Sequence, residues 1–333
     1  MKRFIMLAAI GLTLFSCQQP KHYISINGFA QGTTYSITYQ ADSNFNYQRE
    51  IDSLLADFDT SCSIYNANSI VSRINSNDTT VRADKHFTAV FNLSRMVWEK
   101  SNGAFDITIG PLAEAWGFGF KNKVKLDSAM VDSLKALVGM EKIRLENGSL
   151  IKADPRMFIN LNAVAQGYSS DVVAEFLESK QIMNYMVEIG GEIRTNGLNS
   201  KGKEWVIGVD KPVDNAIPGE TFQFLLALSG KSVATSGNYR KFYEENGVKY
   251  AHTIDPKSGF PVRHTLLCAT VIADDCGTAD AFATAFMVVG IDKARDMIST
   301  LKGVDAIFVY TDAQGVYKTL ATEGAKKFII EED

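Results

Sequence analysis

The sequence predicts an α+β protein with a substantial antiparallel sheet. Segments with helical spacing of hydrophobic residues alternate irregularly with short strand-like runs, and most of these runs lie in the second half of the chain. This distribution favours an α+β architecture over a regular strand–helix–strand repeat. No Gly-x-Gly-x-x-Gly follows a strand and no Walker loop is present, so the sequence does not indicate a Rossmann or P-loop nucleotide site.

The elements are expected from their hydrophobic periodicity. In the first helix, Ile51, Leu55 and Phe58 recur on one face. The expected helices cover 47–58, 87–100, 128–138, 168–179, 280–288 and 292–301. The expected strands cover 34–39, 186–189, 205–209, 222–228, 250–254, 269–273 and 306–310.

Composition limits the class of protein. The chain has 333 residues, of which 46% are hydrophobic, so it can bury one large core or two medium ones. Its formal net charge is −4 and it has no basic tract interleaved with aromatic residues, which argues against a nucleic-acid partner.

The chain has four cysteines, none in a Cys-x-x-Cys spacing, so zinc is not indicated. If Cys17 is modified, three thiols remain and at least one stays free. One disulfide can form among them, and Cys268 and Cys276 are the nearest pair.

The amino terminus has the pattern of an export signal. Lys2 and Arg3 precede an apolar run that is too short to span a bilayer and that ends at Cys17. This ending resembles a bacterial lipobox, so we expect a signal peptide at 1–16, lipidation of Cys17 and a tether at 17–27. The alternative is an ordinary signal peptide with a chance cysteine. Both interpretations export the protein, and residues 28–333 are expected to form one domain with subdomains.

Asp280 and Thr284 stand four residues apart in an Ala-rich helical segment. Their side chains would project from one face about one turn apart, and a carboxylate with a hydroxyl can hold a hard cation such as Mg²⁺. The spacing alone is more typical of an acid near a helix start and a core-facing threonine, so by itself it favours a structural role over a metal site.

Several glycine-rich turns accompany these residues, and their order along the chain is informative. The motifs are Gln31-Gly32-Thr33; Ser63-Ile64-Tyr65 followed by Ser69, Ser72 and Asn75; Gly103-x-x-Asp106 with Gly110-Pro111-Leu112 and Trp116-Gly117-Phe118; Ala165-Gln166-Gly167-Tyr168-x-x-Asp171; Gly190-Gly191-Glu192; Thr235-Ser236-Gly237-Asn238; His252-Thr253-Ile254-Asp255-Pro256; and Ala279-Asp280-Ala281-x-Ala283-Thr284. From Gly28 to about Ile330 the chain resembles the ApbE family of FAD:protein FMN transferases.

The resemblance implies a two-lobed α+β fold with a flavin cleft between the lobes. It also implies that FAD is the substrate, that Mg²⁺ lies on its diphosphate, and that FMN passes to a Thr or Ser hydroxyl of an acceptor protein as AMP leaves. The acceptor is expected to be a membrane-associated electron-transfer subunit. The protein would be a lipoprotein of the bacterial cell envelope that faces the periplasm.

The site residues follow from the same resemblance. The metal ligands would be the Ala163 carbonyl and the side chains of Asp280 and Thr284. The FAD contacts would be Gln31, Tyr65, Ala104, Phe105, Asp106, Asn160, Gln166 and Thr253. Asn160 and Gln166 replace residues that are often charged in the family; amides keep the hydrogen bonds and lose the charge, so we expect flavin binding to persist.

His252 is the candidate for proton transfer, because an imidazole titrates near neutral pH, and Asp255 could serve instead. The alternative for His252 is a structural role at the Asp255-Pro256 turn. Two other functions stay open: a hydrolase that splits FAD into FMN and AMP in the same cleft, and a flavin-binding lipoprotein without enzymatic activity.

Overall fold

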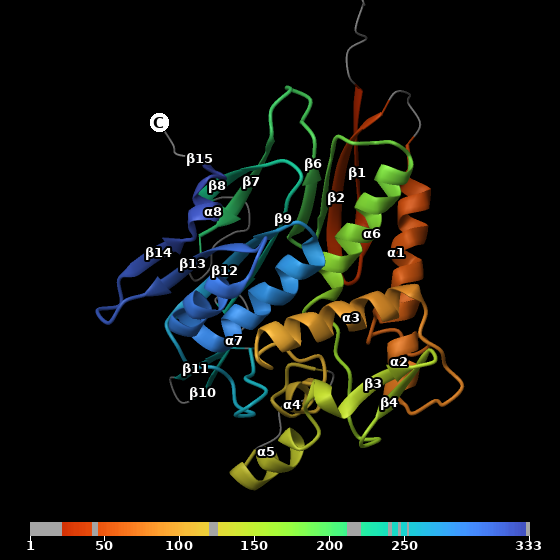
Figure 1. Cartoon of the computed structure of the whole chain (residues 1–333), viewed down its shortest axis with the longest axis vertical. Coiled ribbons are helices and arrows are strands. Elements are labelled where there is room, and N and C mark those ends of the chain that lie inside the picture. Colours follow the sequence, from red (N-terminus) through yellow and green to blue (C-terminus); the bar gives the residue numbers. More distant parts are fainter. Residues whose placement is uncertain are drawn as a thin grey trace, which may run out of the picture.

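A computed structural model of the chain describes residues 22–41, 46–119, 126–211, 221–238, 242–245, 248–251 and 253–330. The central feature is an eight-stranded sheet in the order β1-β2-β5-β6-β9-β12-β13-β14 (Figure 1). Every neighbouring pair in it is antiparallel. Its strands are β1 (His22–Ala30), β2 (Thr33–Ala41), β5 (Tyr185–Ile189), β6 (Glu192–Asn196), β9 (Ser232–Gly237), β12 (Leu266–Ala273), β13 (Asp305–Thr311) and β14 (Tyr317–Ala321).

Two helices that are central to the site, α6 (Ala165–Ser179) and α7 (Cys276–Thr300), lie on one face of this sheet (Figure 1). The other helices are α1 (Gln48–Cys62), α2 (Ile70–Asn75), α3 (Lys85–Lys100), α4 (Gly110–Ala115), α5 (Ser128–Lys135) and α8 (Glu323–Lys326). The shorter elements are η1 (Met140–Lys142), β3 (Ile143–Glu146), β4 (Ser149–Lys152), β10 (Phe242–Glu245) and β11 (Val248–Ala251).

Alternation along the strands buries both faces of the sheet. Phe308 on β13 faces α7, where its ring meets Phe286 edge-on at 5.3 Å between centroids. Its neighbour Ile307 points to the other face, into a cluster with the three-stranded sheet β15-β8-β7. That second sheet contains β7 (Trp205–Asp210), β8 (Phe222–Leu228) and β15 (Ile329–Ile330). Because α7 covers one face of the late strands and the second sheet covers the other, hydrophobic residues need not alternate with polar ones along these strands.

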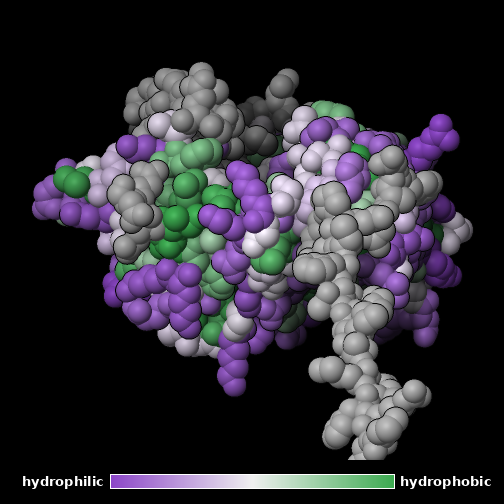
Figure 2. Space-filling view, turned by 90° about the horizontal axis from the view of Figure 1, so that it is seen from above, coloured by the Kyte–Doolittle hydropathy of each residue, from purple (hydrophilic) through white to green (hydrophobic). Residues whose placement is uncertain are grey.

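The surface is mostly hydrophilic on the face seen from above. Hydrophobic side chains gather there on the side of the β13–β14 hairpin (Figure 2). Among the described helices, none is long and apolar enough to cross a membrane.

The α+β prediction is confirmed, and each expected helix overlaps an observed one. The two helices expected at 280–288 and 292–301 are the halves of α7, which Gly290 interrupts with a φ of 76°. The strand expected at 250–254 is wrong at its end, because β11 stops at Ala251 and Ile254 forms only an isolated bridge with Pro261.

Two further expectations need correction. Residues 22–27, assigned to the tether, belong to β1 and pair with β2, so the folded domain begins earlier than residue 28. Cys62, Cys268 and Cys276 are buried and no disulfide joins any two of them, so the suggested Cys268–Cys276 disulfide does not form. Residues 1–21, including Cys17, lie outside the described part of the chain.

Candidate active site

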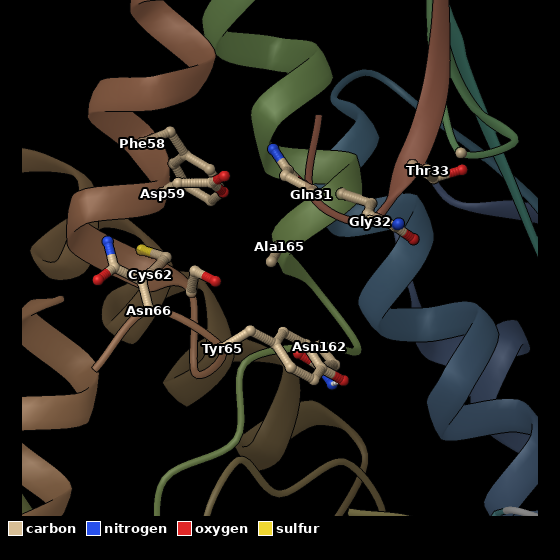
Figure 3. Close-up of a pocket in the computed structure, with 13 residues that line it drawn as sticks. Gln31, Gly32, Thr33, Phe58, Asp59, Cys62, Tyr65, Asn66, Asn162 and Ala165 are labelled. Carbon is tan, nitrogen blue, oxygen red and sulfur yellow. Dashed lines mark hydrogen bonds between the residues drawn. The ribbon is translucent and has the colours of Figure 1, made fainter. Parts of the chain in front are cut away.

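A cavity of about 700 Å³ opens beside the amino-terminal end of α6 (Figure 3). The β1–β2 turn, the end of α1 with the loop after it, and the start of α6 form its walls. Its lining residues are Gln31, Gly32, Thr33, Phe58, Asp59, Cys62, Ser63, Tyr65, Asn66, Asn162, Ala165, Gln166 and Gly190. Three of the expected flavin contacts, Gln31, Tyr65 and Gln166, therefore meet at one cavity.

Gln31 reaches the cavity because of the turn that carries it. Gln31 and Gly32 are the two central residues of the β1–β2 hairpin, and their φ angles of 54° and 75° fit a tight turn of the type that matches strand twist. Both polar atoms of the Gln31 side chain are buried and have no hydrogen-bond partner in the described structure. Buried polar groups are normally paired, so this amide is suited to a bound ligand.

A chain of hydrogen bonds links the cavity wall to the segment before α6. The Asn162 Nδ2 donates to the Tyr65 hydroxyl at 3.0 Å, and the Asn162 backbone N–H donates to Asn160 Oδ1 at 3.0 Å. Asn160 thus holds the loop rather than lining the cavity, and Asn162, which the sequence did not indicate, takes the place at the wall.

Asp280, the carboxylate expected to bind a cation, lies directly behind the wall formed by Ala165 and Gln166. Gly167 N–H donates to Asp280 Oδ2 at 3.1 Å. Gly167 is the third residue of α6, so its N–H is one of the first donors of the helix that have no partner within it, and the Asp280 carboxylate satisfies this donor.

The contact between α6 and α7 is unusually close at this point. A Cβ on Gly167 would lie 2.5 Å from the Cys276 carbonyl oxygen and 2.7 Å from the Asp280 Cβ. Thr284, one turn after Asp280, places its hydroxyl 3.3 Å from the Ser236 hydroxyl of β9. The Asp280 carboxylate and the hydroxyl groups of Thr284 and Ser236 thus lie between α6, α7 and β9.

Asp171 fixes the start of α7 against α6. Its two carboxylate oxygens accept the Cys276 and Gly277 N–H groups, each at 2.8 Å, and Arg194 donates to one of them at 2.8 Å. Asp275 accepts from the Thr278 N–H, so three of the first N–H groups of α7 are satisfied by carboxylates. This anchoring sets the position of Asp280 along α7.

The electrostatics of this region suit a cation. Burial raises the pKa of Asp280 to about 7. Burial, and then the charge of Asp280, also raise the pKa of Glu192 well above its usual range. In the described part of the chain, no three His, Cys, Asp or Glu side chains form a metal cluster, so a site here would depend on carbonyl and hydroxyl ligands too. Such a hard, all-oxygen donor set fits Mg²⁺.

The remaining expected contacts lie elsewhere. Ala104 and Phe105 are buried, and Asp106 lines a separate hollow of about 490 Å³ near Gly103 and Lys257. The Asp106 carboxylate accepts from the Thr108 N–H, the Thr108 hydroxyl and the Met140 N–H, so it organises its own loop.

The expected residues after β11 have local partners where they are described. The Thr253 hydroxyl donates to Asn238 Oδ1 at 2.8 Å. Asp255 accepts from the backbone N–H groups of Lys257 and Ser258, as an acid in a turn does. His252 lies outside the described residues.

A folded α+β protein that gathers hard oxygen ligands beside a helix amino terminus and a polar cavity is suited to bind a phosphorylated ligand together with a divalent cation. Comparison with known proteins identifies the family. The ApbE family matches residues 31–308. The FAD:protein FMN transferase of Haemophilus influenzae is 35% identical over 97% of this chain and 96% of its own, and that of Vibrio cholerae is 34% identical over 99% of each.

Solved structures agree with this match. The flavin transferase ApbE from Vibrio cholerae superposes with a TM-score of 0.83 at 32% identity, over 93% of this chain and all of that one. The apo flavinyl transferase ApbE of Pseudomonas stutzeri gives a TM-score of 0.82 at 28% identity, over 92% of this chain and 97% of that one. The chain belongs to the ApbE family, which confirms the resemblance drawn from its motifs.

Proposed function

We propose that this protein transfers FMN from FAD to a hydroxyl group of an acceptor protein. Its relatives with the same fold carry that activity in their names, and it matches two of them along nearly their whole length. One observation carries the proposal: the first turn of α6 lines the 700 Å³ cavity and also binds the Asp280 carboxylate through the Gly167 N–H.

In the proposed reaction, the oxygen of an acceptor Thr or Ser attacks the phosphorus of the FMN half of FAD. The bond between this phosphorus and the bridging oxygen breaks, and AMP leaves with the electron pair. The hydroxyl loses its proton to a base, so atoms and charges balance. Alignment of the hydroxyl opposite the leaving phosphate and neutralisation of the phosphate oxygens would provide most of the rate.

Ala163, Asp280 and Thr284 would hold Mg²⁺, which would supply positive charge to the diphosphate and stabilise the charge that develops on AMP. The first turn of α6 begins at the cavity wall, and the partial positive charge at a helix start favours phosphate there. Gln31 and the hydrogen-bonded pair of Tyr65 and Asn162 would orient the ligand from the opposite walls.

His252 remains our candidate for the proton acceptor. The two backbone hydrogen bonds to the Asp255 carboxylate give that residue a structural task, which favours His252 over Asp255. His252→Asn should lower the rate by about 10²–10⁴ with little change in FAD affinity. Near wild-type turnover in this variant would exclude an acid–base role.

The direct test is mass spectrometry of an acceptor fragment after incubation with the protein, FAD and Mg²⁺. Addition of one FMN, with equimolar AMP, supports the transferase. Release of FMN and AMP without labelled acceptor would support the hydrolase, and retention of intact FAD would support the flavin-binding lipoprotein. Asp280→Asn should abolish transfer while the protein keeps its circular dichroism spectrum.

We further propose that Cys17 carries a lipid anchor that holds the protein at the bacterial cell envelope, facing the periplasm, where a membrane-associated electron-transfer subunit would be its acceptor. The apolar run that ends at Cys17 supports this. Cys17→Ala should move the protein from the membrane fraction to the soluble fraction without loss of activity on a soluble acceptor fragment. Membrane retention of the variant would argue against the anchor.

A further inference from the structure

Glu192 is a buried acid that the proposed reaction has not used. It begins β6, directly after the Gly190–Gly191 turn, and the residue is only 8% exposed. Its Oε2 atom is fully buried and has no hydrogen-bond partner in the described structure. Buried carboxylates are almost always paired with a cation or with donors, so this one calls for a partner.

Two acids of the neighbouring helix α6, Asp171 and Glu178, are paired with Arg194, unlike Glu192. Arg194, two residues further along β6, donates to Asp171 at 2.8 Å and reaches Glu178 at 3.4 Å. Its guanidinium is therefore committed to those two acids. The strongest charge acting on Glu192 comes from another acid, Asp280.

The backbone around Glu192 is held against the first turn of α6. Ser170 Oγ donates to the Glu192 carbonyl at 3.2 Å and contacts the Gln166 carbonyl at 3.3 Å. On the other side of the turn, a Cβ on Gly190 would lie 2.9 Å from the Gln166 Nε2. Glu192 is thus fixed below the α6 turn that carries the cavity residue Gln166 and the Gly167 N–H bound to Asp280.

Two carboxylates in one buried site repel each other strongly when both are ionised, because the interior screens charge poorly. A shared proton or a bound cation would relieve this repulsion. Thr284 follows Asp280 by one turn of α7 and adds a hydroxyl oxygen, which a hard cation can bind and a shared proton does not need. The donor set therefore favours a divalent cation as the partner.

We propose that Glu192 supplies the second carboxylate of the cation site and acts with Asp280 on one divalent ion. This inference rests on the cation site of the proposed function and extends it by one residue. It gives the site two negative charges, which strengthens attraction for the ion before the anionic FAD arrives. Loss of a carboxylate that supports a metal ligand typically weakens metal affinity by about 10–100-fold.

A titration of the FAD-free protein with Mn²⁺ tests the proposal. Binding is measured as the decrease of the electron paramagnetic resonance signal of free Mn²⁺. Glu192→Gln keeps size and hydrogen-bonding capacity but removes the charge, so we expect Mn²⁺ affinity to fall about 10–100-fold. Glu188→Gln is the matched control, because Glu188 lies on the same hairpin and its Oε1 accepts the Gly191 N–H at 2.8 Å. Its Mn²⁺ affinity should stay within about twofold of wild type.

Wild-type affinity in a folded Glu192→Gln would overturn the proposal and show that the two acids share a proton instead. Asp280→Asn separates the two levels of inference. If wild type binds Mn²⁺ and Asp280→Asn does not, the cation site stands whatever Glu192→Gln shows. If Asp280→Asn binds Mn²⁺ like wild type, the cation site itself fails, and with it the role of Glu192.

Melting curves provide a second measurement. Mg²⁺ that binds only the folded protein raises its melting temperature, so the rise should be smaller in Glu192→Gln than in wild type and Glu188→Gln. If Glu192→Gln does not fold, Glu192→Asp replaces it in the experiment. This variant keeps the charge on a side chain that is one methylene shorter. Mn²⁺ affinity should then fall below wild type, and an unchanged affinity would refute the proposal.

Discussion

Substitution of Gly167 by alanine tests whether close contact between α6 and α7 builds the cation site. Gly167 lies in the first turn of α6, and its N–H donates to Asp280. A Cβ there would meet a backbone oxygen of α7 at 2.5 Å and the Asp280 Cβ at 2.7 Å, both closer than nonbonded atoms approach. Neither is the end of a flexible side chain, so the two helices must separate.

Two effects oppose each other in this variant. Alanine favours a helix over glycine by about 1 kcal/mol in a helix interior, and by less in the first turn. Overpacking at a tight contact destabilises by about 1–3 kcal/mol. We expect the contact to dominate, with a net loss of about 1–2 kcal/mol and a melting temperature about 2–3 °C lower. Movement of Asp280 should also weaken Mn²⁺ binding about tenfold.

Gly277→Ala is the control for Gly167→Ala. Gly277 lies in the first turn of α7, but the closest atom to its added Cβ would be the flexible end of Leu93, at 2.7 Å, and the nearest backbone atom, Tyr168 Cα, lies further away at 3.3 Å. This side chain can move, so stability should change by less than about 1 kcal/mol and Mn²⁺ affinity should stay the same. Thermal melting and Mn²⁺ titration of both variants decide the matter. A Gly167→Ala protein that melts at or above wild type, with unchanged Mn²⁺ affinity, would refute the reasoning.

Three further outcomes are expected. Asp171→Asn should lower the free energy of unfolding by about 3 kcal/mol in urea titrations, because it leaves Arg194 short of its buried charged partner; a loss below about 1 kcal/mol would contradict this anchoring role. Burial lowers the pKa of His264, so the unfolded chain binds its proton first and stability should fall as pH drops below about 6.5; His264→Gln should remove that part of the pH dependence, and an identical pH profile would argue against it. Burial raises the pKa of the Cys62 thiol to about 12, so iodoacetamide at pH 8 should leave it unmodified in the native protein and label it in guanidinium; rapid native labelling would contradict its burial.

Much of the fold was predictable because the local spacing of hydrophobic residues identifies helices. The spacing of Ile51, Leu55 and Phe58 marks the buried face of α1, and all three side chains are buried. The strand β1 was missed since its pattern is mostly exposed at an edge of the sheet and follows directly on the supposed tether. Its assignment depends on pairing with β2, which a local pattern does not contain.

The site was predictable where its residues belong to one helix or one turn, because local spacing then sets their relative positions. Asp280 and Thr284 share a helix, so their spacing already placed two oxygens together, and Gln31 lies at a turn that its neighbour Gly32 indicates. Asn162 was not predictable, because its role depends on Tyr65, 97 residues earlier in the chain. Glu192 was visible in a motif, but its burial beside Asp280 depends on how β6 docks under α6.

The contact between α6 and α7 therefore has a different role from the cavity wall. Gln31, Tyr65 and Asn162 stand on the turn and loops around the cavity, and changes there should alter flavin affinity first. Gly167 and Asp171 lie at the junction of two helices that also form the core, so changes there should reduce stability and metal affinity together. A variant that loses flavin binding but keeps Mn²⁺ binding, and a second variant that loses Mn²⁺ binding with part of its stability, would show that the protein places its ligand and its cation by these two separate means.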